Sequence, residues 1–80
     1  MKNMEKVIKI IEEVLKDNGI NVSLSEDFGL IKELSIDSVI AIEILVAIEN
    51  EFDITIDDAD LSLGLLETPR VICDYINKKI

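Results

Sequence analysis

Apolar side chains recur at helical spacing near the start of the chain. Over residues 4–17 they fall at positions i, i+3, i+4 and i+7, which predicts an amphipathic helix. Its apolar face comprises Met4, Val7, Ile8, Ile11, Val14 and Leu15. Asn18 and Gly19 follow, and a glycine just past a helix end can adopt the left-handed conformation that terminates the helix. We therefore expect the first helix to end near residue 17 and Ile20 to fold back onto its last turn.

Residues 18–36 show no comparable repeat and predict a long connection. Several apolar residues within it should pin the connection to the core, and one short helical turn near 26–33 would fit the pattern. These residues are Phe28, Leu30, Ile31 and Leu34. A connection of this length inside a small domain often has a functional role.

The second long helix is predicted for residues 38–52. Asp37 precedes it and is a good N-cap, because its carboxylate can accept a hydrogen bond from the free N–H groups of the first turn. Stepping round the helix at about 100° per residue gives a core face. That face comprises Ala41, Ile44, Leu45, Ile48 and Phe52.

The opposite side of this helix mixes acidic and apolar side chains. Glu43 and Glu49 lie there, and the apolar residues among them are Val39, Ile40, Val46 and Ala47. An exposed mixed patch of this kind often marks a docking surface. The alternative is that the connection 18–36 covers it.

Residues 53–67 predict a second connection, with a short helix near 58–62 that Gly64 would prevent from continuing. Thr68 as N-cap and Pro69 at the first helical position then start a last helix that runs to about residue 78. These elements predict an all-α protein. We expect a small four-helix bundle, with three main helices and one short helix, a long first loop and a single domain over residues 1–80.

Charge narrows the choice of partners. The 80-residue chain has a formal net charge of −9, and no Lys or Arg occurs between Glu33 and Pro69. This acidity argues against nucleic acid and anionic membranes as partners, and it suits enzymes with basic docking patches. Solubility alone is the alternative explanation. The charged N-terminal residues lack the apolar region of a signal peptide, so we expect a cytoplasmic protein. We also expect it to be a monomer.

The chain lacks the residues that many catalytic sites need. The chain has no histidine, and we expect its single cysteine, Cys73, to be a buried inert thiol. An EF-hand calcium loop starting at Asp53 fails, because Asp58 stands where glycine is needed and Gly64 where glutamate is needed. We therefore expect neither an enzyme nor a specific metal site.

Ser38 is the one candidate for chemistry. Its hydroxyl would point outward at the start of the second long helix, where the helix dipole stabilises an anionic group. Without a catalytic group beside it, the serine would be a site that another enzyme modifies.

The residues around Ser38 also resemble those of a known family. The run Leu34-Ser35-Ile36-Asp37-Ser38-Val39 resembles the acyl carrier protein signature, roughly L-G-x-D-S-L. The similarity extends over about residues 4–78. Beyond the signature, the matching residues are Glu43, Ile44, Glu49, Glu51, Phe52 and the run Asp74-Tyr75-Ile76.

The resemblance implies a carrier function. Ser38 would bear 4′-phosphopantetheine, added from coenzyme A by a separate phosphopantetheinyl transferase, and Asp37 would help that enzyme to place its metal ion. The thiol of the group would hold acyl, aminoacyl or polyketide intermediates as thioesters and pass them between acyl-loading and acyl-processing enzymes. The residues implied to contact these partners are Val39, Glu43, Val46, Glu49 and Ile56.

Three departures from the family pattern leave the pathway open. Ser35 replaces a usual glycine, Asp57 stands where proline is frequent, and Ile40 replaces a residue that is often acidic or polar. Ile40 would add apolar area to the docking surface. Fatty acid biosynthesis and a dedicated polyketide, nonribosomal peptide, aminoacyl or lipid pathway both fit. The alternatives to a carrier are an unmodified acidic helical interaction module and a weak binder of divalent ions.

Overall fold

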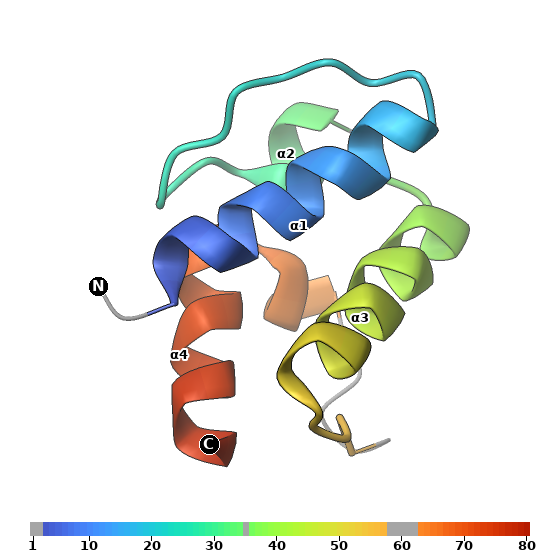
Figure 1. The fold of residues 1–80 in the computed structure, drawn as a ribbon. Coiled ribbons are helices and arrows are strands. Elements are labelled where there is room, and N and C mark those ends of the chain that lie inside the picture. The colour runs from blue at the N-terminus through green and yellow to red at the C-terminus, as the bar shows by residue number, and fades with distance from the viewer. Residues whose placement is uncertain (1–2, 35, 58–62) are drawn as a thin grey trace.

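Three main helices and one short helix make up the fold of the computed structural model, which describes residues 3–34, 36–57 and 63–80 (Figure 1). The α-helices are α1 (Met4–Asp17), α2 (Leu30–Leu34), α3 (Ser38–Phe52) and α4 (Pro69–Lys79), and a 3-10 helix, η2 (Leu63–Leu66), precedes α4. No strand occurs among these described residues. The predicted all-α class is confirmed.

The first helix ends as its sequence predicts. Gly19 adopts the left-handed conformation with φ of 81°, and the Ile20 N–H donates a hydrogen bond to the Leu15 carbonyl oxygen at 2.8 Å. Ile20 thereby packs against the core. This closure uses carbonyl groups that would otherwise lack a partner at the helix end.

The core is aliphatic and is built around α1. That helix packs against both α3 and α4 (Figure 1). Contact with two helices widens its buried face, so Ile10 is buried although the predicted apolar face omitted it. The other buried apolar residues of the helices include Val7, Ile11, Leu15, Ala41, Ile44, Leu45, Ile48, Ile72, Cys73 and Ile76.

The long connection between α1 and α3 contains the expected short helix, α2. Leu30 is fully buried, whereas Phe28, Ile31 and Leu34 are half-buried and pack against the core. The Leu24 N–H donates a hydrogen bond to the Glu12 carboxylate at 2.8 Å, which ties the connection to α1. The connection is therefore held along its length.

Residues 53–67 carry two predictions that the structure does not test. Gly64 was expected to stop a short helix near 58–62 from continuing, and it lies inside the 3-10 helix η2. A 3-10 helix is only one turn long here, and such short pieces tolerate a glycine that a longer α-helix would disfavour. The short helix predicted near 58–62 falls outside the described residues.

The last helix begins with the predicted cap. The Thr68 hydroxyl accepts a hydrogen bond from the Val71 N–H at 3.2 Å, and Pro69 occupies the first turn. Ile72 and Ile76 are buried and Tyr75 is half-buried. In the part of the chain that the structure describes, no helix is both long and apolar enough to span a bilayer.

Candidate functional site

Ser38 is the first residue of α3, and its side chain is exposed. Asp37 precedes it in an extended conformation, and its Oδ1 atom accepts a hydrogen bond from the Ile40 N–H at 2.9 Å. This bond is the N-cap that the sequence predicts, and it fixes the direction in which the chain enters the helix. The Ser38 hydroxyl thus lies at the positive end of a 15-residue helix, open to solvent.

The Ser38 hydroxyl has no activating group. Among the described residues it makes no hydrogen bond to another side chain, and the sequence contains no histidine that could act as a base. A serine hydroxyl without a neighbouring base is a weak nucleophile.

An apolar stripe runs along α3 from this site. Val39 is 62 % exposed, Ile42 is 60 % exposed and Val46 is 46 % exposed. Their spacing of three and four residues places them on one side of the helix. Sequence reasoning had assigned Val39 and Val46 to this side but had assigned Ile42 to neither side, although its position three residues after Val39 was a usable signal. Ile40 is half-buried and packs against the core.

The two glutamates of this helix differ in their surroundings. Glu43 is exposed, and its carboxylate accepts a hydrogen bond from the Asn18 side-chain amide at 3.0 Å. Glu49 is half-buried, and its carboxylate accepts a hydrogen bond from the Ile56 N–H at 2.8 Å. Glu43 therefore offers a charge to the surface, whereas Glu49 holds the chain that follows α3.

Ile56 does not fit the expectation that it contacts partner enzymes. Its side chain is only 6 % exposed and belongs to the hydrophobic core. The chain reverses direction after α3, where Asp53 adopts a left-handed conformation with φ of 53°. This reversal, together with the bond to Glu49, turns Ile56 inward.

Other sites for chemistry are absent from the described ranges 3–34, 36–57 and 63–80. Within them, no group of three or more His, Cys, Asp or Glu residues could hold a metal ion. Cys73 is buried as predicted, and this burial raises the pKa of its thiol. The thiol is therefore uncharged at neutral pH and unreactive in the folded protein.

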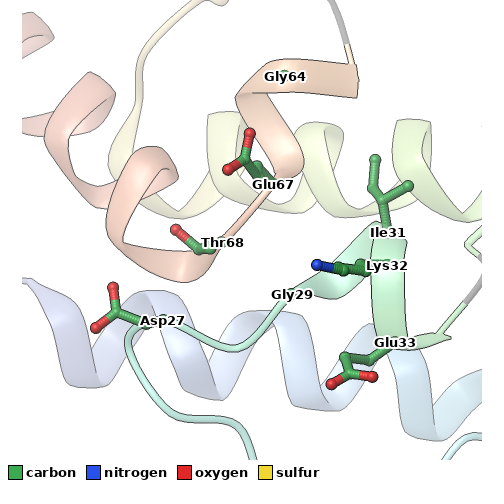
Figure 2. Close-up of a pocket in the computed structure, with 8 residues that line it drawn as sticks. All are labelled: Asp27, Gly29, Ile31, Lys32, Glu33, Gly64, Glu67 and Thr68. Carbon is green, nitrogen blue, oxygen red and sulfur yellow. The ribbon is translucent and has the colours of Figure 1, made fainter.

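A surface cavity of about 670 Å³ lies between α2 and the segment that leads into α4 (Figure 2). Ile31, Lys32 and Glu33 line it from α2, and Glu67 and Thr68 line it from the facing segment. Ser38 is not among its lining residues. Ile31 is the one large apolar side chain among the described residues that line it.

Comparison with known proteins gives a consistent result. A family model described as "Phosphopantetheine attachment site" matches residues 5–76. The acyl carrier protein of Buchnera aphidicola subsp. Schizaphis graminum is 40 % identical over 80 residues, covering 99 % of this chain and 96 % of that protein. The acyl carrier protein of Thermotoga maritima is 29 % identical over 82 residues, covering 100 % and 99 %.

A mitochondrial relative shares a shorter region. The protein named "Acyl carrier protein, mitochondrial" from Saccharomyces cerevisiae is 43 % identical over 56 residues, which are 68 % of this chain and 45 % of that protein. No solved structure matches the chain significantly.

Proposed function

The chain belongs to the acyl carrier protein family, and we propose that Ser38 is the residue that bears its phosphopantetheine group. Members of this family are carriers that catalyse nothing themselves: they bear phosphopantetheine and shuttle acyl intermediates between enzymes. When bound, the group supplies the thiol that holds the acyl chain.

The position of Ser38 carries the proposal. Its exposed hydroxyl starts α3, so a phosphodiester formed there would lie at the positive end of the helix dipole. The neighbouring Asp37 carboxylate already caps α3, which keeps the turn ordered before any group is attached. Mapping the modified residue by fragmentation mass spectrometry tests the assignment: attachment at any serine other than Ser38 would contradict it.

Asp37 has a second role in the proposal. One of its carboxylate oxygens, Oδ1, is occupied by the Ile40 N–H. The exposed side chain leaves the other oxygen accessible to the transferase, where it would help to place the metal ion of that enzyme. Asp37 thus acts for the transferase and is not part of a metal site within this chain.

The family implies modification by a phosphopantetheinyl transferase and exchange with biosynthetic enzymes. We propose that these partners bind the α3 docking surface, defined as Val39, Ile40, Ile42, Glu43 and Val46. The apolar stripe would supply contact area, and Glu43 would attract basic residues of the partner. Glu49 adds negative charge at the edge of this surface, while burial excludes Ile56 from it.

Membership of the family connects the chain with fatty acid biosynthesis. A dedicated pathway is the second candidate, because Ser35, Ile40 and Asp57 depart from the family pattern. Loading the modified protein with fatty acyl, aminoacyl and polyketide starter units by their respective enzymes separates the two candidates.

The remaining proposals concern organisation and location. We propose one carrier domain over residues 1–80 that acts as a monomer in the cytoplasm. The bacterial relatives support the location, although one relative is named as mitochondrial.

A further inference from the structure

A charged clamp joins the connection before α2 to the first turn of α4. The Arg70 guanidinium donates two hydrogen bonds to the Asp27 carboxylate, at 2.8 and 3.1 Å. It also lies 3.6 Å from a carboxylate oxygen of Glu26. We call these three residues the Arg70 clamp. The parallel pair of bonds to Asp27 needs the planar fork of arginine, which a lysine cannot reproduce.

Two backbone hydrogen bonds lie beside the Arg70 clamp. The Arg70 N–H donates to the Glu26 carbonyl oxygen at 2.9 Å, and the Leu30 N–H donates to the Glu67 carbonyl oxygen at 3.0 Å. The chain on both sides of the cavity in Figure 2 is therefore fastened, with Asp27 on one side and Thr68 on the other. The connection before α2 and the start of α4, about 40 residues apart in sequence, are thus bonded to each other.

Helix stability does not explain the position of Arg70. The residue lies in the first turn of α4, where a cation is unfavourable because it meets the positive end of the helix dipole. Thr68 and Pro69 already provide a strong start for this helix. Arg70 is also the only arginine in the chain. Its hydrogen bonds and its salt bridges to carboxylates are with the connection before α2, and the charge of Asp74, four residues further along α4, adds a smaller favourable interaction.

The clamped segment is close in sequence to Ser38. α2 ends at Leu34 and α3 begins at Ser38, so only three residues separate the two helices. One of them, Ile36, is buried in the core. The turn that carries Asp37 and Ser38 therefore lies close to α2 along the chain.

We propose that Arg70 is a positioning residue for the modification of Ser38. By holding α2 against the start of α4, it keeps the turn at Asp37 and Ser38 in one arrangement that the transferase recognises. This inference rests on the proposed attachment at Ser38. Arg70 lies on a different helix from the α3 docking surface, so its effect would pass through α2.

The test compares Arg70→Gln with the wild type in two measurements. Amide hydrogen exchange of the unmodified protein should show about threefold to fivefold less protection at Leu30 and at position 70, because an exposed ion pair makes a modest contribution to local opening. In transferase assays, KM for the carrier should rise by about twofold with kcat unchanged, since KM increases in proportion as the fraction of molecules that present the competent turn falls.

Two further variants serve as controls. Lys79→Gln removes a different ion pair of the same helix, that of Lys79 with Asp57 at 2.9 Å, at its far end. It should leave KM within the error of the wild type. Arg70→Lys keeps the charge but loses the paired hydrogen bonds, so it should resemble Arg70→Gln.

The outcomes separate this inference from the proposed function. Equal KM values for the wild type and Arg70→Gln, or a full rescue by Arg70→Lys, would overturn the positioning role while leaving Ser38 as the attachment site. A folded wild type that takes up no group would overturn both.

Discussion

The Glu49 carboxylate accepts a hydrogen bond at 2.8 Å from the backbone N–H of Ile56, seven residues further along the chain. The bond closes the reversal after α3, and the Ile54 N–H adds to it by donating to the Glu49 carbonyl oxygen at 3.1 Å. An acidic residue on the outward side of a carrier helix therefore stabilises the fold, although its sequence position suggested a docking role.

Removing this carboxylate should destabilise the protein. In Glu49→Ala the half-buried Ile56 N–H loses its acceptor, which typically costs about 1–2 kcal/mol and lowers the melting temperature of a domain of this size by about 5–10 °C. Glu43→Ala is the matched control, because the Glu43 carboxylate is exposed and accepts only from the Asn18 side chain. Thermal unfolding followed by circular dichroism measures both. Equal melting temperatures for the two variants would refute the structural role of Glu49.

Substitutions of Asp37 should separate its two roles. Asparagine is a good N-cap but carries no charge, so Asp37→Asn should keep the melting temperature and lower transferase turnover. Asp37→Ala should lose turnover as well as about 1 kcal/mol of stability, because the Ile40 N–H loses its cap. Turnover of Asp37→Asn at the wild-type rate would show that the carboxylate does not serve the transferase.

The exposed stripe on α3 should contribute to partner binding. Ile42 is 60 % exposed, so Ile42→Ser should leave stability almost unchanged and weaken transferase binding by about tenfold, as expected for a contact residue in an interface. Ile80→Ser makes the same substitution at another exposed isoleucine and serves as the control. Ile80 is 59 % exposed at the end of the chain and is not part of the α3 docking surface. The dissociation constant of each variant for the transferase, measured by calorimetry, should distinguish Ile42→Ser from Ile80→Ser. Equal losses in the two variants would mean that general apolarity matters, not the α3 docking surface.

The contribution of Asp27 to stability should depend on pH in one direction. The hydrogen bonds and charge of Arg70 hold the pKa of the Asp27 carboxyl below its usual range. A lowered pKa in the folded state gives a stabilisation that is fully present above the pKa of the unfolded chain and is lost as pH falls through the folded-state pKa. Asp27→Asn should therefore melt below the wild type at neutral pH, and the gap should close only in acid.

Melting curves of the two proteins from neutral pH down to about pH 2 test this expectation, because ordinary aspartate titrates near pH 4 and the folded-state pKa of Asp27 lies below that value. The difference between the curves isolates Asp27 from the other carboxyl groups, which titrate in both proteins. A gap that is constant across this range would show that the Asp27 charge is not what stabilises the clamp.

Local signals made α3 and the cap at its start predictable. The capping bond joins Asp37 to Ile40, three residues apart, and α3 begins and ends at the residues that the pattern indicates. The start of α4 at Thr68 and Pro69 has the same local origin. In each case the atoms that define the feature lie within one helical turn, so the sequence alone contains the information.

Features that depend on distant contacts were not predictable. The family resemblance implied that Ile56 contacts partners, whereas its burial follows from the chain reversal at Asp53 and from the hydrogen bond to Glu49. The Arg70 clamp joins residues 43 positions apart, and the basic residue in the first turn of α4 gave no indication of its partner. The burial of Ile10 likewise requires that α1 touch two helices at once.

The central claim is that Ser38 bears the phosphopantetheine group. The most direct test is the intact mass of the protein after incubation with coenzyme A, magnesium and a broad-specificity phosphopantetheinyl transferase, with Ser38→Ala treated in parallel. We predict one added phosphopantetheine on the wild type and none on a Ser38→Ala variant that remains folded, because the exposed serine contributes little to the core. An added group on Ser38→Ala, or none on the folded wild type with a transferase that modifies a related carrier, would contradict the account.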